Sequence, residues 1–517
     1  MATVPEKRAV AGSFIFRLSP EGRRPQVALF RRSAEVRTYR HRYAPISGSV
    51  EADDADALTT AWRELAEETG LGPSSLRLLR QGKPYSFVDE AVGREWTINP
   101  FAFALRTDGP GEAAIKLDRE HESFAWFDPA EIPEDDNDGG DIDATSSSFR
   151  GVPHLLDSLR RVWFELELRP AAAAAVLDDG LRRLRDDHTS GARQLASVAL
   201  DTLIRVLPVL HRPPNDSARW WRSLRIAAWH LWKNGREAMG ASILRLLLDA
   251  LTLVETKLPP DGTDSLPDGF IDNVLDALQG IAQRRLESGA ALQEAFASFV
   301  RRDQATRADT SPIRIISLSS SATVASCLDR ALAQGLALDV HVLESRPLFE
   351  GASMARAIAA SIRAAGNLPG ASVSVHTDAS VALAARGANI LLLGADLIDA
   401  SGNVSNKTGS LPAVLAVRHV APAVKVVVVA ESEKVLPLDS PSASEDNNPD
   451  QVSRAWADDD RAATQAGNVH LSNVYFEWVP AGLIDSYITE AGVATGEDIA
   501  GLARDARARL DRFFSNL

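Results

Sequence analysis

Three glutamates crowd the last turns of one expected helix. Glu64, Glu67 and Glu68 lie three and four residues apart, so their carboxylates share one helix face. Like charges at this spacing destabilise a helix unless something neutralises them. Mg²⁺, or Mn²⁺ in its place, is bound by a few carboxylates together with phosphate oxygens and water. The spacing therefore predicts a divalent-cation site, with Arg63 placed to orient one carboxylate.

A second set of polar residues follows a short apolar run late in the chain. Ile390 to Leu393 is typical of a strand buried on both faces of a parallel sheet. Ligands bind beyond the carboxyl ends of such strands, which is where Asp396 falls. Asn406 and Lys407 then add an amide and an ammonium, a set suited to holding a phosphate.

Other groups in this half of the chain could also hold an anion. The Arg346 guanidinium can grip a phosphate by two parallel hydrogen bonds. Two expected helices begin with free backbone amides beside serines, although an ordinary helix cap explains the first of them equally well. The substrate-binding candidates are Arg63, Ser190, Gly191, Arg193, Ser319, Ser320, Ser321, Arg346, Asn406 and Lys407.

Three kinds of segment are expected to position these residues. The first part predicts strands at Ala11–Leu18 and Val27–Arg31, the glutamate helix over Asp53–Gly70, and a closing helix over Phe149–Leu168. From about 170 to 308 the pattern is helical, with almost no strand signal. The third part alternates apolar runs with helical segments, which predicts a doubly wound parallel sheet.

Six apolar runs are the predicted strands of that sheet. They are Ile313–Ile316, Leu338–Leu343, Ser372–Val375, Ile390–Leu393, Val424–Val429 and Val474–Phe476. Polar residues follow most of them, and the carboxyl ends of parallel strands meet at one edge, so these polar groups are expected to converge. Pro437–Ala466, rich in Ser, Asp and Asn, predicts an extended loop near that edge.

Composition narrows the function classes. With 517 residues, two or three domains are expected. A net charge of -14 argues against nucleic acid as the main partner, because binding the phosphate backbone needs a basic face. Cys327 is the single cysteine, so no disulfide or thiolate metal site is expected. We expect a cytoplasmic protein, because neither a secretory signal nor a membrane-spanning stretch is evident.

The glutamate helix resembles a known motif. Arg63-Glu-Leu-Ala-Glu-Glu-Thr-Gly-Leu71 is similar to the core of the Nudix box. Upstream, the family's Gly falls on Ser49, with Gly48 one residue early, and its outlying Glu falls on Ala55, so Asp53, Asp54 or Asp56 is expected near the missing carboxylate. The resemblance implies an α/β/α sandwich and a Mg²⁺-dependent pyrophosphohydrolase in which Glu64, Glu67 and Glu68 are catalytic and bind the metal.

The third part resembles another family. Gly394-Ala-Asp396, Asn406-Lys-Thr-Gly409 and Glu344-Ser-Arg-Pro347 are similar to motifs of the alpha, beta and delta subunits of translation initiation factor 2B and of ribose-1,5-bisphosphate and methylthioribose-1-phosphate isomerases. The resemblance implies a Rossmann-like domain, a nucleotide or sugar phosphate as ligand, Asp396 as catalytic acid or base, and a homodimer through this domain. The reactive Cys of the isomerases falls on Ser319.

These observations predict a multi-domain α/β protein. A Nudix sandwich over residues 1–168 is followed by a helical domain over 169–310 and a Rossmann-like domain over 311–517. The intact glutamate set favours a Nudix hydrolase of a nucleoside-diphosphate-linked substrate, fused to a sugar-phosphate-binding domain. Two alternatives stay open: a phosphosugar isomerase, against which Ser319 counts, and a non-catalytic regulatory protein like initiation factor 2B.

Overall fold

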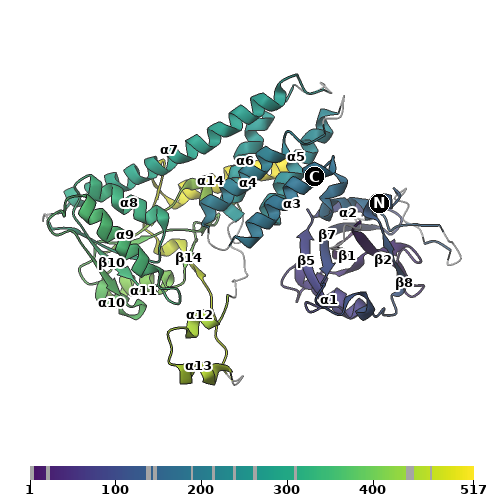
Figure 1. Ribbon diagram of the computed structural model, residues 1–517, viewed down its shortest axis with the longest axis horizontal. Coiled ribbons are helices and arrows are strands. Elements are labelled where there is room, and N and C mark those ends of the chain that lie inside the picture. Colours follow the sequence, from purple (N-terminus) through teal and green to yellow (C-terminus); the bar gives the residue numbers. More distant parts are fainter. Residues whose placement is uncertain are drawn as a thin grey trace.

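The chain folds into a strand-rich unit, a helical bundle and a sheet unit covered by helices (Figure 1). The computed structural model describes residues 5–18, 24–134, 141–143, 148–187, 190–211, 216–236, 240–259, 265–307, 311–437, 447–465 and 469–517. This arrangement confirms the predicted multi-domain α/β class. Within the described residues no helix is both long enough and apolar enough to pass through a bilayer.

The first unit is built on a mixed sheet of eight strands. They are β1 (Glu6–Arg17), β2 (Gln26–Arg32), β3 (Tyr43–Ala44), β4 (Ile46–Ser49), β5 (Leu76–Gln81), β6 (Tyr85–Asp89), β7 (Arg94–Leu105) and β8 (His121–Phe127). The main path runs β3-β2-β1-β7-β5, with β1 and β7 parallel, while β4, β6 and β8 pair with β1, β7 and β2.

Alternating side chains of β1 face two different cores. Phe14 and Phe16 pack on one face, against helix α2 (Leu155–Val162). Ala11 and Ile15 pack on the other, against helix α1 (Ala57–Thr69). A strand places successive side chains on opposite faces, so one strand can serve both cores. The sheet between two helices is the sandwich that the sequence predicted.

The middle of the chain is helical, as expected. Its described helices are α3 (Ala171–Asp186), α4 (Ala192–Val206), α5 (Ser217–Lys233), α6 (Gly240–Glu255) and the 36-residue α7 (Phe270–Ala305). The first half of α7 packs in the bundle core, whereas Leu292 and Phe296 near its end pack in the core of the sheet unit. One continuous helix thus joins the two parts, and Figure 1 shows it running from one to the other.

The last unit is a sheet with the order β11-β10-β9-β12-β15-β17-β18. Its strands are β9 (Ile313–Leu318), β10 (Leu338–Leu343), β11 (Ser372–His376), β12 (Ile390–Leu393), β15 (Lys425–Val429), β17 (Ser486–Thr489) and β18 (Gly492–Ala494), of which only β18 runs antiparallel to its neighbour. Helices α8 (Ala322–Ala333) and α9 (Glu350–Ala364) lie on one face with the end of α7. Helices α10 (Val381–Ala384) and α11 (Ser410–Val420) lie on the other, giving the expected doubly wound fold.

The sixth predicted strand does not belong to this sheet. Phe476–Val479 forms β16, which pairs antiparallel with β14 (Val404–Lys407) in a separate three-stranded sheet completed by β13 (Leu397–Ile398). The strand that pairs with β15 is instead β17. This strand has four residues and contains no long apolar run that would have predicted it from the sequence. The final helix α14 (Gly496–Phe514) then returns to the bundle, where Phe513 and Phe514 are buried.

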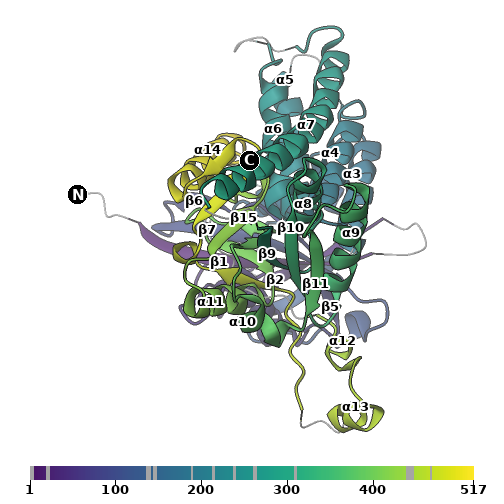
Figure 2. The same cartoon turned by 90° about the vertical axis from the view of Figure 1, so that its left-hand side faces the viewer.

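Part of the predicted loop Pro437–Ala466 forms an arm. Helices α12 (Asp450–Ser453) and α13 (Asp458–Gln465) project from the sheet unit in both views (Figures 1 and 2). Residues 438–446 and 466 of this segment lie outside the described residues. At the base of the arm, the Val452 carbonyl accepts a hydrogen bond from the Arg346 guanidinium at 2.8 Å. The described part of the segment therefore reaches the sheet edge, as expected.

Candidate functional site

The glutamate helix α1 has a cap at each end. The Asp56 carboxylate accepts a hydrogen bond from the Thr59 amide at 2.8 Å, so the helix begins at Ala57 rather than at Asp53. Gly70 ends it in a left-handed conformation with φ of 68°, which glycine adopts without a Cβ penalty. Both caps lie close to the glutamates, so the carboxylates are carried by a fixed helical frame.

Arg63 ties the first glutamate to the loop before the helix. Its guanidinium donates to Glu64 at 2.7 Å, to Asp54 at 3.0 Å and to the Ser49 carbonyl at 3.2 Å. The hydrogen bond to Arg63 keeps the Asp54 pKa far below its usual range. On the other side of Glu64 lies Gly48, where an added Cβ would stand 1.8 Å from the Glu64 Oε1. Only glycine fits there while Glu64 keeps this position.

Glu68 is the least solvated of the three carboxylates. The side chains of Glu64, Glu67 and Glu68 are 13%, 60% and 7% exposed. Among the described residues Glu68 Oε2 has no hydrogen-bond partner, and His121 Nδ1 stands 3.7 Å away. Burial lowers the His121 pKa, which favours the neutral ring. Burial first, and then the nearby carboxylates of Glu64, Glu120 and Asp118, raises the pKa of Glu68 to about 9.

A divalent cation fits this chemistry. A buried carboxylate oxygen without a hydrogen-bond partner, beside a second carboxylate, is costly to ionise unless a positive charge lies nearby. A bound cation would supply that charge. Among the described residues no three Asp, Glu, His or Cys side chains stand close enough to form a complete metal cage. Mg²⁺ suits such a partial set, because it keeps several waters and takes substrate phosphate oxygens as ligands.

The three upstream aspartates have different surroundings. Asp54 is held by Arg63 and Asp56 caps α1, while Asp53 is exposed. Besides Glu64, the carboxylates that raise the Glu68 pKa come from the segment at the start of β8, which carries Asp118 and Glu120.

The raised pKa of Glu68 predicts a pH-dependent stability. Its folded pKa of about 9 lies above the unfolded value of 4.5, so the folded state binds the proton more tightly. Stability from this group is full below pH 4.5 and falls as the pH rises towards 9. In EDTA, we expect the free energy of unfolding from urea titrations to fall between pH 6 and pH 8.5, and to fall less in Glu68→Gln. Equal pH slopes for the two proteins would contradict this.

At the carboxyl edge of the parallel sheet, Asp396 lies among lysines. Burial raises its pKa, while Lys434 and Lys407 pull it down. Lys434 is itself buried, and its ammonium donates to the Ala395 carbonyl at 2.5 Å. Next to them, an added Cβ on Gly394 would stand 3.0 Å from Ser321 Oγ, so the strand end and the start of α8 approach closely.

Lys407 is already paired within the protein. Its ammonium, with the side chain 6% exposed, donates to Glu350 at 3.0 Å and lies 4.6 Å from the centre of the Tyr475 ring. Neighbouring Asn406 donates to Ser410 Oγ at 2.9 Å. The start of α11 is also occupied, because the Glu477 carboxylate accepts hydrogen bonds from the Gly409 and Leu411 amides. A phosphate entering here must compete with Glu350.

The predicted anion-binding loop after β9 is hydrogen-bonded to the segment after β10. The Ser319 amide donates to Ser345 Oγ at 2.6 Å, and Ser319 has a φ of 61°. Ser321 caps α8 by accepting from the Val324 amide, whereas Ser320 is exposed. Arg346 is exposed too, and its guanidinium points to the Val452 carbonyl of the arm. Cys327 is buried in α8, and burial raises its thiol pKa to about 12, which disfavours the reactive thiolate.

The start of α4 meets the same sheet edge. Arg193 pairs with Glu431, just after β15, at 3.2 Å and also donates to the Arg285 carbonyl. Two residues earlier, Gly191 is the N-cap of α4, while the Ser190 amide is taken by the Asp187 carboxylate. Of the groups predicted for this helix start, Arg193 is therefore the one that the described contacts bring to the sheet edge.

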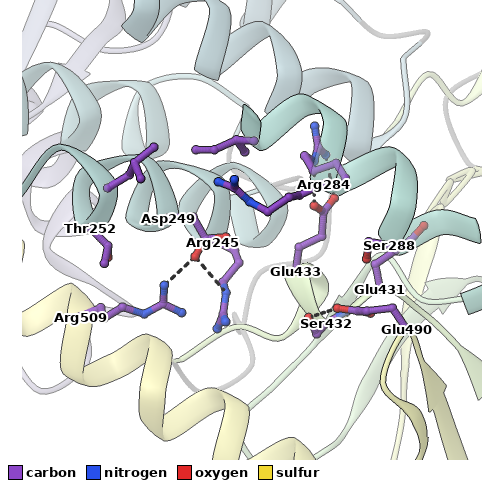
Figure 3. A pocket seen from close by; sticks show the side chains of 13 residues that line it. Arg245, Asp249, Thr252, Arg284, Ser288, Glu431, Ser432, Glu433, Glu490 and Arg509 are labelled. Atoms are coloured by element: carbon purple, nitrogen blue, oxygen red, sulfur yellow. Dashed lines mark hydrogen bonds and ion pairs between the residues drawn. The ribbon is translucent and has the colours of Figure 1, made fainter. Parts of the chain in front are cut away.

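A cleft of about 440 Å³ lies on the bundle side of this edge, between α6, α7, α14 and the segment after β15 (Figure 3). Its charged groups are largely paired with one another. Asp249 accepts from Arg509 at 2.6 Å and lies 3.7 Å from Arg245, and Glu433 pairs with Arg285 at 2.8 Å. The Arg285–Glu433 pair connects the bundle with the segment after β15, so the cleft is a polar junction between the bundle and the sheet unit.

Several residues at these sites were not among the sequence candidates. Glu350 and Tyr475 contact Lys407 but lie far from it in sequence, and no motif flagged them. Glu431 and Lys434 follow β15 and belong to none of the motifs in the sequence. In the first unit, Arg32 acts on Glu68 from β2, and its place beside α1 depends on tertiary packing.

The fold and the side chains described above define an α/β protein with a group of carboxylates on its first unit and buried charged side chains at a parallel sheet edge. Residues 8–145 match the model of the NUDIX domain, and residues 243–496 match the Initiation factor 2 subunit family. The chain thus joins a NUDIX domain to a domain of the Initiation factor 2 subunit family. The NUDIX domain indicates a hydrolase, and the relatives of the second domain include isomerases.

Curated relatives and solved structures are similar to part of the chain. Methylthioribose-1-phosphate isomerase of Rhodopirellula baltica is 36% identical over 175 residues, which are 32% of this chain and 45% of that protein. The isomerase of Ectopseudomonas mendocina is 31% identical over 174 residues, or 33% and 45%. The chain spans about half the length of these relatives. Among solved structures, the translation initiation factor eIF-2B of Pyrococcus horikoshii OT3 has 22% identity and a TM-score of 0.42, covering 64% of this chain and 99% of that one.

Proposed function

We propose that the protein is a Mg²⁺-dependent Nudix hydrolase that cleaves a diphosphate linking a nucleoside to another group. The observation that carries this proposal is the buried Glu68 carboxyl, whose Oε2 has no hydrogen-bond partner among the described residues and which interacts with Glu64. A structural helix face would not keep such a group, because burying an uncompensated carboxylate is costly.

The side chains divide the work between them. Glu64, Glu67 and Glu68 would hold Mg²⁺ or Mn²⁺, which supplies charge to the diphosphate and acidifies a bound water. Arg63 positions Glu64 through its 2.7 Å hydrogen bond. Arg32 lies close enough to Glu68 to lower its pKa and offers a cation to a phosphate oxygen. The raised pKa of Glu68 belongs to the metal-free protein, so binding of the cation displaces the proton from this carboxyl.

A substrate screen tests the proposal. The full chain is incubated with nucleotide sugars, dinucleotides and pentose phosphates, with Mg²⁺, with Mn²⁺ and with EDTA. We expect a nucleoside monophosphate and a second phosphorylated product from at least one diphosphate, and none in EDTA. Hydrolysis that is as fast in EDTA as in Mg²⁺ would contradict the proposal.

A second candidate function belongs to the sheet edge. The raised pKa of Asp396 between Lys407 and Lys434 supports acid or base catalysis on a bound phosphosugar, the chemistry named for the isomerase relatives. Ser319 stands where those isomerases carry their cysteine, and no base is hydrogen-bonded to its hydroxyl in the described residues. We therefore place sugar-phosphate binding, rather than isomerisation, first for this domain.

We also propose a homodimer through the sheet unit. The apolar stretch Val424–Val429 gives no support, because most of it is buried within the chain. Helices α10 and α11 give better support, since Leu383 and Leu415 are 63% and 51% exposed. Light scattering of the full chain should give a dimer or a multiple of one, and Leu383→Asp with Leu415→Asp should give a monomer. The control Val88→Asp, on the exposed face of β6, should stay a dimer; dissociation by Val88→Asp alone would move the interface to the NUDIX domain.

A further inference from the structure

Three aromatic side chains of the NUDIX domain are not accounted for by its cores. Tyr85 and Phe87 of β6 and Trp96 of β7 belong to neither of the two clusters that cover the sheet, and all three are partly exposed. The register pairs Phe87 with Trp96, and Tyr85 lies two residues before Phe87, so the three share one face of the hairpin. The Tyr85 and Phe87 rings are stacked with centroids 6.1 Å apart. They form an aromatic wall outside both clusters. Helix α2 supports one side of it, because the Tyr85 hydroxyl is hydrogen-bonded to Ser158 at 2.8 Å and the His154 ring lies 4.1 Å from the Phe87 ring centre.

This wall lines a cavity of about 200 Å³. Pro45, Gly48 and Val152 also line it. Tyr39 also lines the cavity and donates to the buried Asp89 carboxylate at 2.5 Å, and burial with this hydrogen bond raises the Tyr39 pKa so that the phenol stays protonated. Arg32 is the one charged residue among the lining residues that the structure describes. The cavity therefore offers flat apolar faces and a single cation.

The cavity adjoins the glutamates directly. Gly48 belongs to its lining and also touches Glu64, as the space for an added Cβ shows. Ser49, the next lining residue, accepts a hydrogen bond from Arg63 through its carbonyl. Arg32 lines the cavity, and its charge also lowers the pKa of Glu68. A ligand lying in the cavity can thus extend past Gly48 to the carboxylates. Arg32 lies between the cavity and the carboxylates.

We infer that this cavity binds the nucleobase of the substrate, stacked on the wall of Phe87 and Trp96, with Arg32 on the adjoining phosphate. The assignment rests on the hydrolase function proposed above. Sites for whole drug-sized ligands measure roughly 300–1,000 Å³, so a smaller cavity takes one part of a ligand and leaves the rest outside. Aromatic side chains stack well on any base. A sugar or a lipid chain gains less from three aromatic faces, and a second phosphate would need a second cation.

The test uses the full chain in EDTA, so that binding is measured without hydrolysis. Calorimetric titrations with adenosine, guanosine, cytidine and uridine 5′-monophosphate should show binding of at least one of them. Loss of one stacking partner weakens base binding by roughly 5- to 150-fold, so we expect that change in Kd for Phe87→Ala and for Trp96→Ala. Phe87→Tyr, which keeps the ring, should bind within about threefold of the wild type.

Two controls separate this site from others. Val88→Ala changes an exposed neighbour on the opposite face of β6 and should leave the Kd unchanged. Lys407→Ala alters the sheet-edge site and should also leave it unchanged, which places the measured binding in the NUDIX domain. Circular dichroism melts of Phe87→Ala and Trp96→Ala establish that folding is intact.

The outcomes distinguish this inference from the proposed function. Wild-type affinity in both Phe87→Ala and Trp96→Ala, or no binding of any of the four nucleotides, overturns the nucleobase assignment. If the variants lose nucleotide binding while no diphosphate is ever hydrolysed, the cavity assignment stands and the hydrolase proposal fails. If nucleoside diphosphate derivatives are hydrolysed with the same KM by wild type and variants, the hydrolase stands and the cavity assignment fails.

Discussion

Glu68→Gln should lower the rate of Mg²⁺-dependent diphosphate hydrolysis at least about 100-fold, because the metal supplies several kcal/mol of charge stabilisation and the amide holds it poorly. The change removes a charge and keeps the shape, so the helix should remain folded. It should even stabilise the metal-free protein above neutral pH, because Glu68 is buried and its pKa is raised to about 9. Activity and stability are thus expected to move in opposite directions.

Glu67→Gln separates the two effects. The Glu67 side chain is 60% exposed, and its carboxylate lies 3.5 Å from the Arg63 guanidinium. The change should therefore lower activity without raising stability. Glu112→Gln, an exposed carboxylate paired with Arg17 away from the glutamate helix, serves as the matched control. Binding of Mn²⁺ measured by calorimetry should weaken in Glu67→Gln and Glu68→Gln and stay unchanged in Glu112→Gln. If Glu67→Gln and Glu68→Gln hydrolyse the substrate panel as fast as the wild type, these carboxylates do not carry the reaction.

The elements that carry the two sites could be predicted because their signals are local. Ile390–Leu393 is a strand with the bounds expected from its apolar run, and Gly70 ends the glutamate helix as expected. The helix start was placed early because Asp53, Asp54 and Asp56 are equivalent in a sequence pattern. Only the folded structure shows that Asp54 pairs with Arg63 and that Asp56 caps the helix.

The electrostatic state of the sites could not be predicted in the same way. Glu68 owes its raised pKa to burial and to carboxylates that the start of β8 brings near it. Glu350 neutralises Lys407 from the first residue of α9, more than fifty positions away. The aromatic wall was missed for a related reason, because Phe87 and Trp96 become neighbours only through the pairing of β6 with β7. Gly93 in the turn between them was the local signal that could have suggested this hairpin.

Lys407→Ala should nearly abolish binding of a phosphosugar at the sheet edge. Truncating one partner of a buried charge pair costs about 2–5 kcal/mol, which corresponds to roughly 30- to 5,000-fold in Kd. Arg346→Ala should weaken binding less, because Arg346 is exposed and its guanidinium is turned to the Val452 carbonyl. Lys425→Ala, at an exposed lysine paired with Asp303, is the matched control. Calorimetry with ribose 5-phosphate measures all three.

Glu350→Gln should change the affinity in the opposite direction. In the folded chain Glu350 holds the Lys407 ammonium at 3.0 Å, so an incoming phosphate has to displace a carboxylate of the same charge. The amide competes less for the ammonium and does not repel the phosphate, so ribose 5-phosphate should bind more tightly than to the wild type. The gain should disappear when Lys407→Ala is added, because both effects act on the same ammonium. Weaker binding in Glu350→Gln would instead mean that Glu350 contacts the ligand itself, as an acceptor for sugar hydroxyls.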